Sequence, residues 1–372
     1  MRVAALEHDD PRAARRRFPS LAALSLALWV ATVATVVSDV KLFRDTTTCD
    51  SPHLRNNDDE SLVLTKPKFP HVAWLMSWPN SGTSYTLRIV REISNQTTAT
   101  NYGNEHLNNK SSILVHPNWT NGPFRATLSQ NLPDTFILTK THCGSRCVHC
   151  APDGYLETQR TFQRSCQTGK RVTNGVEREV IYDPSTISRI GGKAVHLIRN
   201  PLDNIVARFH LSRRHEKDDA DGIAAFFANN ATGFQAWCTR LDTLYLQYES
   251  HTPWLDAPLR KLWKDVPCHA EFFKYAQWHN LALWTAESMD LEVHLLRYED
   301  YDGTNWHRTV ESLLTFLQLP AVAWDDATPF ESRSYHSYYT KVQVANIEAL
   351  LKDVASAPIW DIVGDYFHNK EI

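Results

Sequence analysis

The sequence predicts an α/β protein in which a parallel sheet is flanked by helices. Short apolar runs alternate along the chain with longer segments whose apolar residues recur at helical spacing. Strands joined through helices run parallel, and 372 residues with 42% hydrophobic content can bury one large core or two modest ones. A net charge of −3 supplies no basic field, so we expect no nucleic acid among the partners.

The N-terminal segment predicts a membrane anchor. Arg12 and the three arginines at 15–17 precede an uncharged and mostly apolar run at 18–38. This length is close to the roughly 20 residues with which a helix spans a bilayer. A cleaved signal peptide is the alternative, but its apolar region usually measures only about 7 to 15 residues. The arginines place 1–17 in the cytosol as a tail and everything after the anchor in a lumen.

Two further features agree with a lumenal position. All seven cysteines follow the apolar run, where an oxidising compartment would favour their pairing. The segment 39–70 shows neither strand nor helix periodicity, so we expect a stem that holds a lumenal domain at 71–372 away from the membrane. Glycosylation sequons occur at Asn95, Asn109, Asn118 and Asn230.

The first chemical signal is a strand, a tight loop and a helix. An apolar run at 71–78 stops at Pro79, small residues follow at 81–84, and an amphipathic pattern occupies 86–93. In such an arrangement the N–H groups of the first helical turn, the helix dipole and the loop hydroxyls face one point, which suits a phosphate. The loop lacks the first glycine and the lysine of a Walker A sequence, which argues against an ATPase or a P-loop kinase.

Three more strands are expected, and each ends in polar residues. Strands at 135–139, 193–198 and 292–296 lead into Lys140 and His142, into Arg199, and into the run Arg-Tyr-Glu-Asp. The carboxyl ends of parallel strands meet at one edge of the sheet, where ligands bind.

The remaining segments are expected to be helices and loops. Asn200 and Pro201 are suited to the N-cap and the first residue of a helix that extends through 209. Apolar spacing predicts further helices at 234–248, 271–287, 305–317 and 341–354. The polar segment 95–133 is expected to form surface loops, and 143–182 is expected to be a cysteine-bearing insertion.

The cysteines admit two interpretations. Zinc binding is compatible with the spacing of Cys143, Cys147, Cys150 and Cys166, with His149 among them. In a lumenal protein, disulfides are favoured: two bridges within 143–166, and Cys238 with Cys268 joining two helices. Cys49 in the stem is then left over and would be able to link two chains into a homodimer.

The four strand ends form an ordered set. Pro-x-Ser-Gly-Thr-Ser-aromatic at 79–85 is followed by Lys-Thr-His at 140–142, Arg-Asn-Pro-x-Asp at 199–203 and Arg-Tyr-Glu-Asp at 297–300. This set resembles the sulfotransferase family that uses 3′-phosphoadenosine 5′-phosphosulfate (PAPS), and the resemblance extends by element order over about 72–367. It implies a three-layer, P-loop-like α/β fold, PAPS as co-substrate without a metal, and sulfuryl transfer to a hydroxyl of a glycan, a glycoprotein or a small molecule.

The resemblance also implies roles for individual residues. His142 corresponds to the base that takes the proton from the acceptor hydroxyl, a task suited to a neutral imidazole near pH 7. Lys140 corresponds to a group that stabilises charge on the sulfonate and the departing phosphate oxygen. The 5′-phosphate and sulfate end of the donor is expected to bind the loop residues Asn80, Ser81, Gly82, Thr83 and Ser84, with Tyr85 near the adenine.

Three positions depart from the family or match it weakly. The family usually has lysine in place of Asn80, so Lys140 is expected to carry more of the charge stabilisation. Arg199 matches the 3′-phosphate ligand, but the serine usually found eight positions later is Ala207, with Arg208 as its neighbour and nearest substitute. Arg333 is the nearest candidate for a basic C-terminal segment over the nucleotide.

The resemblance and the N-terminal anchor together predict a single-pass type II membrane protein of the Golgi with a lumenal catalytic domain. An alternative stays open because of Asn80 and Ala207: a catalytically inactive nucleotide- or glycan-binding lumenal protein on the same fold. The acceptor is not specified by any pattern, because loops without motifs determine it in this fold.

Overall fold

The computed structural model describes residues 70–102, 112–115, 124–125, 132–144, 156–173, 176–181, 191–215, 227–251, 257–324, 327, 330 and 333–368. The predicted tail, the anchor and the stem up to residue 69, including Cys49, lie outside these ranges, as do Asn109, Asn118, Cys147, His149 and Cys150. Among the described residues no helix is both long and apolar enough to cross a membrane.

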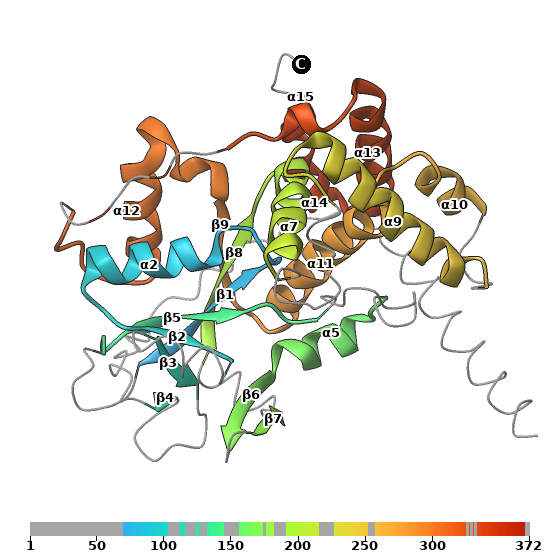
Figure 1. Ribbon diagram of the computed structural model, residues 1–372. Coiled ribbons are helices and arrows are strands. Elements are labelled where there is room, and N and C mark those ends of the chain that lie inside the picture. The colour runs from blue at the N-terminus through green and yellow to red at the C-terminus, as the bar shows by residue number, and fades with distance from the viewer. Residues whose placement is uncertain are drawn as a thin grey trace, which may run out of the picture. The chain divides into compact units, whose positions relative to one another are not determined.

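One sheet organises the described part of the chain. Its strands are β1 (His71–Ser77), β2 (Thr98–Thr100), β3 (Ser112–Val115), β4 (Phe124–Arg125), β5 (Phe136–Thr141), β8 (Gly191–Ile198) and β9 (Glu292–Arg297). Within the described residues the order is β4-β3-β2-β5-β1-β8-β9 (Figure 1). Every neighbouring pair is parallel except β3 with β4, so the predicted parallel sheet is confirmed.

Helices surround this sheet. They are α2 (Thr83–Ser94), α5 (Gln159–Cys166), α7 (Pro201–His215), α9 (Ala231–Glu249), α10 (Ala257–Trp263), α11 (His269–Ser288), α12 (Trp306–Phe316), α13 (Lys341–Val354), α14 (Ala357–Val363) and α15 (Asp365–His368). α7 begins at Pro201 as predicted, and the Oδ1 of Asn200 accepts the N–H of Leu202 at 2.9 Å, which is an N-cap bond.

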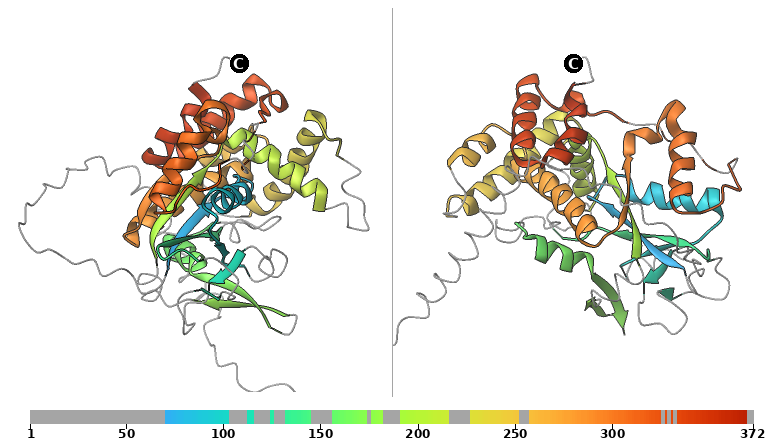
Figure 2. Two further views of the ribbon diagram at one scale, coloured as in Figure 1. Left: turned by 90° about the vertical axis from the view of Figure 1, so that its left-hand side faces the viewer. Right: turned by 180° about the vertical axis from the view of Figure 1, so that it is seen from behind.

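The sheet separates two apolar cores, because alternate residues of a strand point to opposite faces. In β1, Trp74 and Met76 join the core that α7, α9, α11 and α13 cover. Ala73 and Leu75 join the core beneath α2 and α12. Figure 2 shows these two groups of helices on either side of the strands. The two cores therefore make three layers of helix, sheet and helix.

The expectation of surface loops for 95–133 is wrong at three places, and 103–111, 116–123 and 126–131 lie outside the described residues. β2, β3 and β4 lie there and extend the sheet beyond β5. These strands have three, four and two residues, which is too short for a two-residue periodicity to emerge from the sequence. The cysteine-bearing insertion also has regular structure, since it contains α5 and an antiparallel hairpin of β6 (Thr168–Thr173) and β7 (Val176–Ile181).

Candidate active site

The loop between β1 and α2 turns on two residues with left-handed backbones. Asn80 has φ 68° and Gly82 has φ 97°, a region that asparagine and glycine adopt more readily than other residues. Gly82 is also required by space, because a Cβ there would lie 2.2 Å from the ring of Tyr298. The chain thus passes sharply from strand to helix, and α2 begins at Thr83 at the carboxyl edge of the sheet.

Side chains on both flanks hold this loop in shape. The hydroxyls of Ser77 and Thr83 lie 2.7 Å apart, which joins the end of β1 to the first turn of α2. From α7, the Nδ2 of Asn204 donates to the carbonyl of Pro79 at 3.1 Å and to the Oγ of Ser81 at 3.0 Å. Ser81 and Thr83 are buried, whereas Ser84 is exposed. A hydroxyl has three hydrogen-bonding sites, so these bonds leave capacity for a ligand.

Arg199 follows β8 directly and lies against the loop. Its NH1 donates to the carbonyl of Asn80 at 2.7 Å, and its guanidinium lies 4.6 Å from the ring centre of Tyr298. The Nε of Arg199 and the Nδ2 of Asn80 are both buried without a hydrogen-bond partner among the described residues. Two unpartnered donors on residues that are hydrogen-bonded to each other, one of them charged, fit a bound phosphate.

The run Arg-Tyr-Glu-Asp supports this arrangement from β9. Tyr298 packs on Gly82 and Arg199, and the carboxylate of Glu299 accepts the N–H of Asn200 at 2.8 Å. Burial raises the pKa of Tyr298 to about 12, although the charge of Arg199 acts in the opposite direction. Tyr298 is therefore a neutral ring that fixes the loop and Arg199 relative to each other.

His142 lies just beyond the end of β5 and is fixed at three atoms. Its Nδ1 lies 2.8 Å from the carbonyl oxygen of Ser77. A carbonyl only accepts, so Nδ1 carries the proton and, in the neutral ring, Nε2 is the basic nitrogen. Its backbone N–H donates to the hydroxyl of Tyr102 at 2.7 Å, and its carbonyl accepts the indole N–H of Trp278 at 2.8 Å.

Lys140 lies in β5 and His142 just beyond its end, and both side chains lie close to the ring of Tyr102. Tyr102 connects them: its ring stacks on the imidazole with a centroid separation of 6.0 Å, and the Nζ of Lys140 lies 5.8 Å from the same ring centre. The structure thus places the two predicted catalytic side chains on one aromatic support, beside the loop that carries the predicted donor ligands.

Tyr85 lies on α2 and packs into the core on that side of the sheet. Its hydroxyl accepts the indole N–H of Trp306 at 2.9 Å, and its ring contacts the rings of Tyr301 and Phe330. This position is beside the loop, and the adenine contact implied for Tyr85 stays a prediction.

Arg208 belongs to a buried ion cluster. Its Nε donates to Glu271 at 2.5 Å, Glu271 also pairs with Lys274, and the guanidinium lies 5.0 Å from the ring centre of Trp78. Burial by itself would raise the pKa of Glu271, but the charges of Arg208 and Lys274 lower it well below the ordinary value. The structure gives Arg208 a carboxylate partner, and its contact with a 3′-phosphate stays a prediction.

Arg333 is exposed and lies on the α7 side of the site. Burial lowers the pKa of His210 on α7, and the charges of Arg213, Arg214 and Arg333 act in the same direction. Two residues after Arg333, the N–H of Tyr335 donates to Asp203 at 2.7 Å, which ties this segment to the start of α7. A 3′-phosphate contact for Arg333 likewise stays a prediction.

Disulfides join Cys143 to Cys166 and Cys238 to Cys268. The second pair links the helix α9 to the start of α11, as predicted, and the first ties α5 to the residue after His142. In the part of the chain that the structure describes, no group of three or more His, Cys, Asp or Glu side chains is arranged to hold a metal ion.

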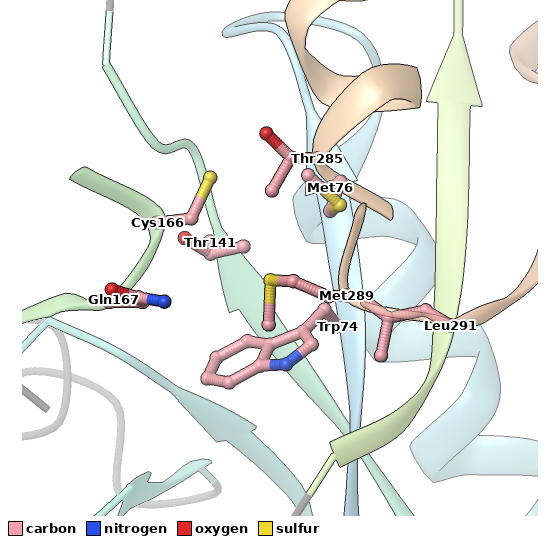
Figure 3. A pocket seen from close by; sticks show the side chains of 8 residues that line it. All are labelled: Trp74, Met76, Thr141, Cys166, Gln167, Thr285, Met289 and Leu291. Carbon is pink, nitrogen blue, oxygen red and sulfur yellow. The ribbon is translucent and has the colours of Figure 1, made fainter. Parts of the chain in front are cut away.

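A narrow cavity lies on the α11 side of the sheet (Figure 3). Trp74, Met76, Thr141, Cys166, Gln167, Thr285, Met289 and Leu291 line it. None of these side chains is charged, so the cavity does not match a phosphate-bearing ligand.

Several residues that hydrogen-bond to the site were not predicted from the sequence. Asn204 and Ser77 each lie close to one of the motifs, and this proximity could have identified them. Tyr102, Tyr275 and Trp278 come from other segments, and no local pattern distinguishes them from ordinary core aromatics.

The site therefore combines a loop whose buried donors would suit an anion with a histidine whose basic nitrogen is defined, at the carboxyl edge of a parallel α/β sheet. Such an arrangement is suited to group transfer. The chain belongs to the sulfotransferase family: the family model described as "Sulfotransferase domain" matches residues 70–353. The family resemblance found in the sequence is thereby confirmed, and it supports sulfuryl transfer as the general activity. A search of curated proteins gives no match.

Proposed function

We propose that this protein transfers a sulfuryl group from PAPS to a hydroxyl group, with a glycan or glycoprotein as the acceptor class. The observation that carries the proposal is the bond between the Nδ1 of His142 and the carbonyl of Ser77, at 2.8 Å. It puts the proton on Nδ1, leaves Nε2 as the basic nitrogen of the neutral ring, and holds the imidazole against the end of β1, where the loop 79–84 begins. A histidine so oriented is suited to deprotonate a hydroxyl near pH 7.

PAPS supplies a sulfuryl group that is already activated by its bond to a phosphate oxygen. The protein then has to align donor and acceptor, to neutralise the negative charge of the phosphates and to remove one proton from the acceptor hydroxyl. Asn80 and Arg199 provide buried donors for phosphate oxygens, and the first N–H groups of α2 add the positive end of a helix. Lys140 supplies the positive charge that the family usually also has at position 80.

The proton balance follows from these positions. His142 takes the acceptor's proton at Nε2 as the acceptor oxygen bonds to sulfur and the bond from sulfur to the phosphate oxygen breaks. Lys140 and Arg199 offset the negative charge that this cleavage leaves on phosphate. No redox change and no metal enter this balance.

We also propose that the chain is a type II Golgi membrane protein, anchored by 18–38, with a stem at 39–70. Two disulfides and two exposed sequon asparagines, Asn95 and Asn230, support a lumenal domain. Asn230 caps α9 through its Oδ1, at 3.0 Å from the N–H of Gly233, whereas a glycan joins the other amide atom, Nδ2.

Two measurements on the purified full chain test the proposed activity. Calorimetry with 3′-phosphoadenosine 5′-phosphate (PAP) measures donor-site binding, and labelled sulfate from PAPS offered to mixed glycan, glycoprotein and small-molecule acceptors measures transfer. We expect both to be positive. Binding without transfer to any acceptor would support the inactive binding protein instead, and absence of both would refute the proposal.

A further inference from the structure

α11 contacts all three strand ends that form the site. The hydroxyl of Tyr275 donates to the carbonyl of Arg199 at 2.7 Å, and the indole N–H of Trp278 donates to the carbonyl of His142 at 2.8 Å. The indole also packs against Trp78, at the start of the anion-binding loop, with ring centres 6.3 Å apart. One helix thus reaches the residues that follow β1, β5 and β8.

The two donating side chains are rigid. Tyr275 and Trp278 are both fully buried, and their separation of three residues puts them on one face of the helix. Burial raises the pKa of Tyr275 well above its ordinary value, so its hydroxyl keeps its proton and donates throughout the physiological range.

α11 is itself fixed relative to the sheet and to α7. Glu271 pairs with Arg208 of α7, and His279 lies 2.8 Å from the ring nitrogen of His196 in β8. Tyr275 and Trp278 lie on this same helix. Their hydrogen bonds to the site are therefore donated from a helix whose position is fixed by other contacts.

The sheet alone does not pair the two loops that carry His142 and Arg199. β5 and β8 lie on opposite sides of β1, and both residues come after the last ladder position of their strands. Transfer to an acceptor depends on alignment between the base and the bound donor, where small displacements are costly. The end of β1 and its loop provide one connection between them, because His142 bonds to Ser77 and Arg199 bonds to Asn80. α11 adds a second connection from outside the sheet.

We infer that Tyr275 and Trp278 are positioning residues that set the spacing between the donor-binding Arg199 and the base His142. This inference rests on the proposed function. It assigns the donor side to Tyr275 and the base side to Trp278, so the two residues have separable effects: loss of the first weakens donor binding, and loss of the second slows transfer.

The Tyr275→Phe variant tests the donor side, since it removes one hydroxyl and keeps the ring. We expect PAP affinity by calorimetry to fall about three- to tenfold, the effect of one hydrogen bond. Tyr339→Phe is the matched control, because its buried hydroxyl also donates to a backbone carbonyl, that of Leu202 in the first turn of α7, at 3.0 Å. It should lower the melting temperature by a similar amount and leave PAP affinity within twofold.

The Trp278→Phe variant tests the base side. We expect kcat to fall about 10- to 100-fold while PAP affinity stays within about threefold. Trp263→Phe is the control, because this indole is equally buried and its Nε1 has no partner among the described residues. It should reduce stability by a similar amount and leave kcat within about twofold.

The outcomes separate this inference from the proposed function. The expected pattern is a loss of PAP affinity in Tyr275→Phe and a loss of kcat in Trp278→Phe, with both controls normal in both respects. Site variants that match their controls would overturn the inference, and so would losses shared by all four variants. If Trp278→Phe does not fold, the calorimetry of Tyr275→Phe against Tyr339→Phe decides. A wild-type chain that binds no PAP would refute the proposed function itself, and the inference with it.

Discussion

The residues proposed to bind the donor, Asn80 and Arg199, and the proposed base, His142, are held in different ways; we call them the donor side and the base side. On the donor side, Asn80 and Arg199 keep buried donor atoms that have no partner among the described residues. On the base side, His142 is held through its Nδ1, its backbone N–H and its carbonyl. Buried donors without a partner cost free energy unless a ligand accepts their hydrogen bonds. The imidazole of His142, in contrast, is already restricted to one orientation in the unliganded protein.

This difference indicates how the two sides contribute. The donor side gains its hydrogen bonds when an anion binds, so changes there should appear in affinity. The base side supplies orientation, so changes there should appear in the rate.

Removal of the base should give the largest effect. We expect His142→Ala to lower the transfer rate by about 10²- to 10⁴-fold, the usual contribution of a positioned general base, and to leave PAP affinity within about twofold. A labelled-sulfate assay and calorimetry measure the two quantities. The exposed His251 at the end of α9 serves as the control. Equal activity in His142→Ala and His251→Ala would refute the base assignment.

The next largest effect is expected on stability, from breaking the buried ion cluster of Arg208, Glu271 and Lys274. Glu271 and Lys274 lie on α11, the helix that contacts both the donor side and the base side. We expect Glu271→Gln to destabilise the protein by about 3–5 kcal/mol, since Arg208 and Lys274 then lose their buried counter-charge. Urea unfolding measures this change, with Glu287→Gln on the exposed face of the same helix as control. A loss under about 1 kcal/mol would show that the cluster is not a support.

The pH dependence of stability should be separate from the pH dependence of transfer. Burial would lower the pKa of His269, but bonds to Asp242 and Glu249 raise it from 6.5 to about 9. Because the pKa of His269 is higher in the folded state, its protonation stabilises the folded protein. This stabilisation is complete below pH 6.5 and is lost as the pH rises through 9. That shift corresponds to about 3 kcal/mol.

Unfolding free energies measured between pH 6 and pH 10 test this expectation. The decline should be present in the wild type and in His142→Ala and absent in His269→Gln. A decline that persists in His269→Gln would assign the effect to another group.

Loss of the donor-side charge should weaken affinity more than rate. We expect Arg199→Met to lower PAP affinity about 10- to 100-fold, the range for a charged hydrogen bond, while kcat at saturating PAPS falls less than tenfold. Arg240 is exposed on α9 and provides the control variant Arg240→Met. A loss of kcat with unchanged affinity would contradict the division between the two sides.

Restoring the family lysine should have the smallest effect. Asn80→Lys adds a positive charge beside the donor, but φ is 68° at this position, which costs a residue other than glycine or asparagine about 1–2 kcal/mol. We expect PAP affinity to change by less than about tenfold. A larger gain would show that Lys140 does not compensate for the missing charge.

The sequence predicted the parts of this molecule that follow local rules. The cap at Asn200 and the extent of α13 depend on neighbouring residues, and both agree with the structure. The short strands β2, β3 and β4 were missed because their pairing, rather than their own pattern, makes them strands. Within the site, the motifs identified the residues at the strand ends. The contacts of Tyr102 and Trp278 with His142 span 40 and 136 residues, which no local pattern encodes.

A crystal structure of the chain with bound PAP would show whether the ends of β1, β5 and β8 form the donor site. We expect the 5′-phosphate at the loop 80–84 within hydrogen-bonding distance of the Nδ2 of Asn80, the 3′-phosphate on Arg199, and the Nε2 of His142 facing the 5′-phosphate end. The same structure would show whether Arg208 or Arg333 reaches the 3′-phosphate. PAP bound away from the ends of β1, β5 and β8 would refute the proposed donor site. A His142 whose Nε2 points away from the nucleotide would refute its role as the base.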